Sequence, residues 1–236
     1  MKRRHPLESR TRAFTRVEAL ACLSVVAILA ALAAPTLAGL RPRSDSAACV
    51  NNLRQIGRAY QIWGHDHNDD PPYRVAMSEG GIQAHPLAGN TWFQFSWVSN
   101  ELATPRVLAC PSDLQKRVAK DFGISADGGF LNSGFRNNAV SYWVGSDAVR
   151  FVPASLVCGD RNVKVAGYGY CSAGISDAGT ILMRPMAGSV WTNNLHGLWG
   201  NVLRYDGQVR TLSNWNLTTN ALSFGDDNGT MHLVLP

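Results

Sequence analysis

Residues 13–40 read AFTRVEALACLSVVAILAALAAPTLAGL, and the run from Ala19 to Leu40 contains twenty-two residues without a charge. A helix rises about 1.5 Å per residue, so this run reaches roughly 33 Å, enough to cross the hydrocarbon core of a bilayer. Glu18 stands at the head of the run, where a carboxylate costs free energy unless it meets a partner. The stretch predicts a membrane-spanning helix over residues 19–40 and makes Glu18 a functional candidate.

The residues before Phe14 form a basic leader, in which five Lys and Arg residues oppose the single acid Glu8. Because this leader holds +4 of the chain's net charge of +5, the remainder carries only +1, and we expect no nucleic-acid partner. Lys and Arg favour the cytoplasmic side of a membrane. We therefore expect a cytoplasmic N terminus and place residues 65–236 outside the cytoplasm as one well-buried domain.

Positions 13–18 hold a small residue, Phe, Thr, any residue, an aliphatic residue and Glu, followed by the long apolar run. This order resembles the processing signal of type IV prepilins and of the pseudopilins of type II secretion systems. The resemblance implies that a prepilin peptidase removes residues 1–13 by cutting between Ala13 and Phe14, and methylates the new amino group. It also implies that Glu18 pairs with the N-terminal ammonium of a neighbouring subunit. The chain departs from the family in having Ala13 instead of Gly before the cut and Arg16 where an aliphatic residue is usual.

Other interpretations of the same segment stay open. A secretory signal peptide also has a basic start and an apolar middle, and Ala31-Leu32-Ala33 or Thr36-Leu37-Ala38 would suit its cleavage. A lipoprotein anchored through Cys22 is a weaker alternative, because most of the apolar run follows that residue. A single-span anchor without processing is the third alternative.

Beyond residue 40 an amphipathic pattern predicts that the helix continues to about residue 64. Gly39 and Pro42 interrupt it, and Ser44 or Asp45 can cap a new start. Its apolar residues recur every three or four positions, as expected of a helix face that packs on a core: Cys49, Leu53, Ile56, Tyr60 and Trp63.

Four short segments extend the resemblance along the chain: Cys49-Val-Asn-Asn-Leu-Arg-Gln-Ile-Gly57, Cys110-Pro-Ser-Asp113, Gly159-Asp-Arg-Asn162, and His196 followed after nine residues by Asp206-Gly207. Together they are similar to a large group of prepilin-like proteins that carry the H-X9-DG motif. The resemblance implies a pilin-like fold.

The spacing around Asp206-Gly207 predicts a hairpin. Strand-like runs at 202–205 and 208–212 flank the pair, which suits a two-residue type I′ turn. A lone histidine with no second ligand at fixed spacing is usually a packed residue. We therefore interpret His196, Asp206 and Gly207 as structural, with ligand binding at His196 as the alternative.

No cofactor is expected, although two loops leave calcium open. The run 65–70 is rich in oxygen and imidazole ligands but lacks the glycine and the final acid of an EF-hand, and it more simply predicts a helix end with a polar turn. The run 226–229 is Asp-Asp-Asn-Gly, for which a turn between strands is the simpler interpretation.

Five cysteines are present, and Cys22 lies inside the apolar run. In a compartment that permits disulfides the other four allow three connectivities. We favour Cys49 with Cys110 and Cys158 with Cys171, and keep free thiols as the alternative.

The sequence predicts an α+β protein, in which a long N-terminal helix, transmembrane and then amphipathic, packs on a C-terminal antiparallel sheet. Frequent glycines and aromatic residues, among them Trp92, Phe93, Phe95 and Trp97, favour short strands and turns after the helix. A loop-rich insertion is expected between about residues 66 and 135. No catalytic motif stands out, so we expect no enzyme.

The function that the resemblance implies is that of a structural subunit in the bacterial inner membrane. Its partners would be copies or relatives of itself, the prepilin peptidase, the assembly platform of a secretion or pilus system, and the lipid bilayer. The alternative is a tethered binding module that grips a polysaccharide or a protein through exposed Trp and Tyr side chains, and uses the signal only for export.

Overall fold

The computed structural model describes residues 15–38, 40–164, 180–183, 190–214 and 231–236, and for residues 33–45 and 180–183 it describes the backbone alone. The chain divides into two units, residues 1–43 and 44–236. Each unit is described by itself.

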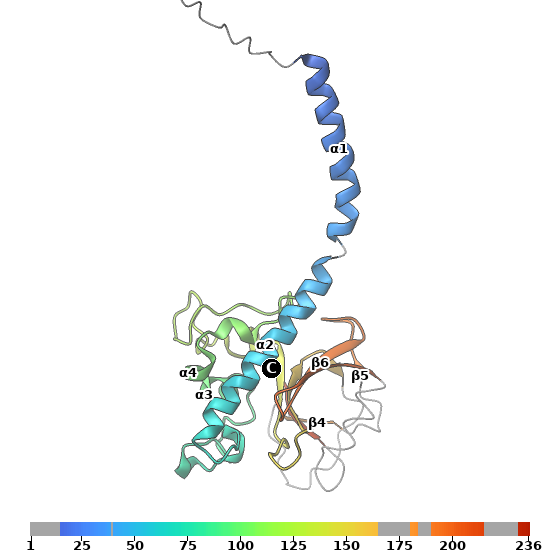
Figure 1. Ribbon diagram of the computed structural model, residues 1–236. Helices are drawn as coiled ribbons and strands as arrows, with labels where there is room; N and C mark the ends of the chain where they lie inside the picture. The colour runs from blue at the N-terminus through green and yellow to red at the C-terminus, as the bar shows by residue number, and fades with distance from the viewer. Residues whose placement is uncertain (1–14, 39, 165–179, 184–189, 215–230) are drawn as a thin grey trace, which may run out of the picture. The chain divides into compact units, whose positions relative to one another are not determined.

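The first unit contains the helix α1 (Arg16–Ala38), which continues through Pro35 (Figure 1). Its apolar side chains are exposed, with Val17, Leu20 and Leu23 at 75%, 67% and 65% of full exposure. Within the part of the chain that the structure describes, no helix meets the combined length and hydropathy requirements for crossing a membrane. From residue 33 onward, the side chains of the span expected over 19–40 lie outside the described residues.

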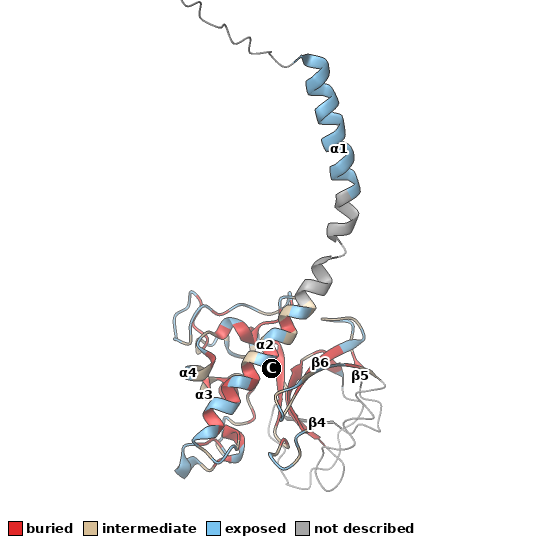
Figure 2. Cartoon of the chain, in the orientation of Figure 1, coloured by how far each residue is buried: buried red, intermediate tan, exposed pale blue. Residues whose placement is uncertain are grey.

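The helix α2 (Leu40–His65) supplies the amphipathic face of the second unit. It begins at Leu40, so the expected start at Ser44 or Asp45 is wrong, and Pro42 is accommodated because the first turn needs no N–H donor there. Figure 2 shows buried and exposed residues alternating along this helix. The predicted stripe is confirmed, since Cys49, Leu53, Ile56, Tyr60 and Trp63 are all at most 9% exposed.

Along the chain, short helices follow α2 and precede the first strand of the sheet. They are η1 (Pro72–Arg74), η2 (Met77–Glu79), α3 (Thr91–Trp97), α4 (Ser99–Leu102), η3 (Pro105–Leu108) and η4 (Arg136–Ala139). The expectation of strands and turns was wrong for the aromatic run of α3. Its apolar residues alternate as in a strand. The buried positions Thr91, Gln94, Phe95 and Val98 recur at helical spacing, and Phe93 is buried beside them.

The sheet has six strands in the order β4-β8-β1-β2-β6-β7, and every neighbouring pair is antiparallel. The strands are β1 (Tyr142–Gly145), β2 (Leu156–Asp160), β4 (Thr180–Met183), β6 (Trp199–Arg204), β7 (Val209–Ser213) and β8 (Met231–Val234). A separate ribbon pairs β3 (Val163–Lys164) with β5 (Val190–Trp191). The predicted α+β class with an antiparallel sheet is confirmed.

Two apolar cores lie on opposite faces of this sheet, because successive side chains of a strand point to opposite sides. Tyr142 and Cys158 belong to the core that contains the α2 stripe, whereas Trp143 and Trp191 belong to the other. The approach of α2 to the sheet is close: a Cβ added at Gly57 would lie 2.9 Å from Leu203 Cδ1. A larger residue at position 57 would therefore require the end of the Leu203 side chain to shift.

Candidate functional site

Three of the four segments that carry the resemblance meet at His196, the first residue of the fourth. A disulfide joins Cys49 on α2 to Cys110, which follows η3, with the Cα atoms 5.2 Å apart. The side-chain amide of Asn52 donates to the carbonyl oxygen of Ala109 at 3.2 Å, one residue before the disulfide. The predicted Cys49–Cys110 pair is therefore confirmed, and it fastens α2 to the loop that precedes the sheet.

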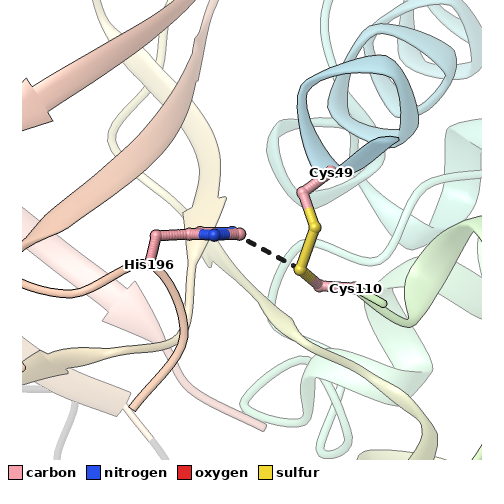
Figure 3. Close-up of side chains that lie close together, drawn as sticks. All are labelled: Cys49, Cys110 and His196. Atoms are coloured by element: carbon pink, nitrogen blue, oxygen red, sulfur yellow. Dashed lines mark hydrogen bonds between the residues drawn. A yellow bond between two sulfur atoms is a disulfide. The ribbon is translucent and has the colours of Figure 1, made fainter. Parts of the chain in front are cut away.

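His196 lies directly against this disulfide. Figure 3 shows its imidazole pointing at Cys110, and the distance from Nε2 to Cys110 Sγ is 3.4 Å. The same Nε2 lies 3.5 Å from Asp160 Oδ2, and the histidine side chain is only 7% exposed. His196 is thus a buried residue placed between a disulfide and a carboxyl group, which agrees with its structural interpretation and shows which groups it contacts.

Asp160 ends β2 on the side of the sheet that faces α2. The backbone N–H and the side-chain amide of Asn201 both donate to Asp160 Oδ2, at 2.7 and 2.9 Å. Burial raises the pKa of Asp160 to about 7, even though these two hydrogen bonds lower it. Its other oxygen, Oδ1, has no hydrogen-bond partner among the described residues. The cluster therefore contains a carboxyl group that titrates near neutral pH.

The next residue, Arg161, joins the same segment to the Cys-Pro-Ser-Asp turn. Its guanidinium donates to both oxygens of Asp113, Nε to Oδ2 at 2.6 Å and Nη2 to Oδ1 at 2.7 Å. Burial is the largest single effect on the pKa of Asp113 and would raise it, but the hydrogen bonds to its carboxylate and the charge of Arg161 together lower the pKa. Burial beside Arg161 also lowers the pKa of Lys116 to about 8. The sequence analysis missed this bidentate pair, because its partners are far apart in the chain and an aspartate and an arginine carry no spacing signal.

Asn162 holds the loop that carries His196. Its amide nitrogen donates to the carbonyl oxygens of Thr192 and Trp199, each at 3.0 Å. Because these residues flank His196 in the chain, the amide fixes both ends of the loop. Three successive residues of the segment 159–162 thus hold different parts of the site. Asp160 contacts His196, Arg161 binds Asp113, and Asn162 binds the loop around His196.

The nine residues between His196 and Asp206 in the H-X9-DG motif contain the whole of β6. His196 precedes β6, and Asp206-Gly207 follow its last residue, so the two parts of the motif lie at opposite ends of β6. Both ends reach α2: His196 approaches Cys49, and a Cβ added at Gly207 would lie 2.9 Å from Gln61 Nε2. Cys49 and Gln61 are separated by about 18 Å of helix. The motif therefore touches α2 at two points several turns apart.

The predicted hairpin around Asp206-Gly207 is confirmed by the pairing of β6 with β7. The predicted type of its turn is wrong. A type I′ turn needs positive φ at both central residues. Among the described residues, Gly207 has a φ of +79° while Asp206 is not in that region. Gly207 N–H donates to the Arg204 oxygen at 3.0 Å and Arg204 N–H donates to the Gln208 oxygen at 2.9 Å. This is a three-residue loop in which Gly207 forms the bulge.

The second predicted disulfide is wrong. Cys158 is a free, fully buried thiol in the centre of β2, and burial raises its pKa well above the usual value. Its side chain belongs to the same apolar core as the α2 stripe. Cys171 lies outside the described residues, and Cys22 is free and exposed on α1.

The loop considered for calcium at 65–70 forms a helix end with a polar turn, as the simpler interpretation predicted. The N–H groups of His67 and Asp69 both donate to the carbonyl oxygen of Gly64, at 2.7 and 2.8 Å. The imidazole of His67 stacks on Trp63 at 3.7 Å. The second loop considered for calcium, 226–229, lies outside the described residues.

Ala13 and Phe14, the expected processing residues, lie outside the described residues, but Glu18 is described. Its Oε2 accepts from the Thr15 N–H and from the Thr15 hydroxyl, both at 2.8 Å, and Thr15 Oγ1 accepts from the Glu18 N–H at 3.3 Å. These reciprocal contacts form a capping box at the start of α1. The sequence analysis missed it, although Thr-x-x-Glu before an apolar run is its signature.

Neither a family model, nor a curated protein, nor a solved structure matches this chain.

Proposed function

We propose that this chain is a pilin-like structural subunit, a pseudopilin or a minor pilin, which is inserted in the bacterial inner membrane by residues 19–40. In this account a prepilin peptidase removes residues 1–13 and methylates Phe14. The head, residues 44–236, then faces the extracytoplasmic side. The assembly platform of a type II secretion or type IV pilus-like system incorporates the subunit into a filament, and the chain itself carries out no catalytic step.

The exposed apolar surface of α1 is the observation that carries this proposal. Large apolar side chains from Val17 to Leu32 are between 55% and 75% exposed. A continuous apolar surface of this kind needs lipid or protein around it. The apolar helices of neighbouring subunits and the bilayer core would each cover it.

The head domain supports the same proposal. The outer helix of a pilin-like subunit packs one face on an antiparallel sheet, and α2 buries its stripe in the core on the sheet's α2-facing side. The Cys49–Cys110 disulfide adds a covalent link between α2 and the head. Force applied to the helix would thus reach the sheet without α2 being pulled away.

The account gives Glu18 two functions that can be separated. In the free chain its carboxylate caps α1 through Thr15. In the filament it would pair with the ammonium of a neighbour's Phe14, where water is scarce and charges interact more strongly. Glutamine at this position retains the cap, because a capping box accepts Glu or Gln, but it removes the charge.

Filament incorporation of three variants, measured in cells with the matching assembly system, tests the proposal. We expect Glu18→Gln and Glu18→Ala to insert in the membrane and to lose incorporation equally. Thr15→Ala, the matched control, weakens the cap but keeps the charge, and should still be incorporated. Normal incorporation of Glu18→Gln would show that Glu18 is only a cap, and the proposed ion pair would be wrong.

A further inference from the structure

Three side chains able to bind a transition metal lie together at the junction of α2 with the sheet. Cys49 Sγ, Cys110 Sγ and His196 Nε2 all lie within 4.8 Å of one another. They come from three separate segments: α2, the loop after η3, and the loop before β6. All three are largely buried, so they lie in a site shielded from water. In the structure the two cysteines form a disulfide.

We propose that the reduced, dithiol form of this cluster binds one Zn²⁺ ion through Cys49, Cys110 and His196, so that a metal replaces the disulfide as the link between α2 and the head. Thiolate and imidazole are the ligands that zinc prefers in proteins. The inference does not depend on filament assembly.

The position of His196 relative to Cys110 fits this proposal. With Zn–S of about 2.3 Å and Zn–N of about 2.0 Å, a tetrahedral ion holds sulfur and nitrogen about 3.5 Å apart. The observed distance from Cys110 Sγ to His196 Nε2 is 3.4 Å. The two sulfur atoms would need to separate to about 3.8 Å once the bond between them is broken. Cys49 Sγ already lies within 4.8 Å of His196 Nε2.

The carboxyl group of Asp160 lies beside His196. Its Oδ2 lies 3.5 Å from His196 Nε2, and its Oδ1 is buried without a hydrogen-bond partner among the described residues. A buried carboxyl oxygen in that state gains a partner when a cation is placed beside it. The site thus offers two thiolates, one imidazole and an adjacent carboxyl group.

The chemistry balances with a dithiol as reductant. The dithiol supplies two electrons and two protons and becomes a disulfide, while the Cys49–Cys110 bond breaks to give two thiols. Zinc binding then releases the two thiol protons to solvent, because the thiolate is the form that binds metal. The oxidised chain has no thiolate at this site and therefore should not hold the ion.

Zinc affinity of the purified full chain, measured by competition with a chromophoric chelator, tests the inference. A phosphine serves as the reductant, because dithiols themselves bind zinc. Together with one water molecule it supplies the same two electrons and two protons and becomes a phosphine oxide. We expect one zinc ion per reduced chain and none per oxidised chain. His196→Ala should weaken binding on the order of 100-fold or more, since even partners of a ligand contribute 10- to 100-fold. The matched control is His65→Ala, which removes an exposed histidine from the end of α2 and should leave affinity unchanged.

Three results would overturn the inference. The first is equal zinc binding by the reduced and oxidised chains. The second is an affinity that His196→Ala leaves unchanged, because binding would then involve thiols alone. The third is a reduced chain whose tryptophan fluorescence remains that of an unfolded protein when zinc is added, because a metal that replaces the disulfide must hold the head folded.

Discussion

Replacing both cysteines of the Cys49–Cys110 pair by alanine should destabilise the head domain strongly. The disulfide closes a segment with a sequence separation of 61 residues. The loss of chain entropy in the unfolded state for a loop of that length corresponds to about 4 kcal/mol at 25 °C. Domains of this size are stable by only about 5–15 kcal/mol, so the double variant should lose a large share of its stability.

Urea unfolding of the full chain, followed by tryptophan fluorescence, measures this loss. All seven tryptophans lie in residues 44–236, so the signal reports the head and not α1. Cys22→Ser is the matched control, because Cys22 is an exposed, free thiol on α1, and it should leave the urea midpoint unchanged. Reduction of the wild-type chain in the presence of a chelator should reproduce the double variant. A loss below about 1 kcal/mol in the double variant would refute the reasoning, because it would mean that packing alone holds α2 on the sheet.

Three further substitutions test the packing and charges around the disulfide. Burial raises the pKa of Asp160 to about 7 from 3.8, so the folded state binds the proton more tightly than the unfolded state. The contribution of this group to the free energy of unfolding should therefore be greatest below about pH 4 and fall by about 4 kcal/mol as the pH rises to 7. Asp160→Asn should flatten urea midpoints measured across that range, and an unchanged slope would assign the pH dependence to other groups. Arg161→Ala should lower the free energy of unfolding by about 3 kcal/mol in the same assay, because it leaves the 1%-exposed carboxylate of Asp113 unpaired. Arg161→Lys should recover part of this loss. Equal stability of the two variants and the wild-type chain would contradict a structural ion pair. Gly159→Ala should lower the free energy of unfolding by about 1–3 kcal/mol and shift the fluorescence of Trp143, because the new Cβ would meet Trp143 Cζ2 at 2.4 Å. A urea midpoint equal to that of the wild-type chain would show that this approach is looser than the structure indicates.

The parts of this fold that are readable from sequence are the local ones. The stripe from Cys49 to Trp63 repeats at helical spacing, so the buried face of α2 follows from periodicity alone. The β6–β7 hairpin follows from an Asp-Gly pair between branched residues. In both cases the residues that decide the structure are neighbours in the chain.

The remainder depends on contacts between distant residues. The aromatic run of α3 alternates like a strand, and only its packing against η4 and β1 selects the helix. The turn at Gly207 was predicted wrongly because an Asp-Gly pair suits both a two-residue loop and a three-residue loop with a bulge. The meeting of His196 with Asp160 and the disulfide could not be predicted, since no spacing within the chain encodes which loops approach one another.

Mass spectrometry of the N-terminal peptide, from protein extracted from membranes of cells with an active prepilin peptidase, tests the central claim most directly. The account predicts a chain that begins at a methylated Phe14 and retains Glu18 four residues later. A chain that keeps residues 1–13, or one that begins after Ala33 or Ala38, would contradict it.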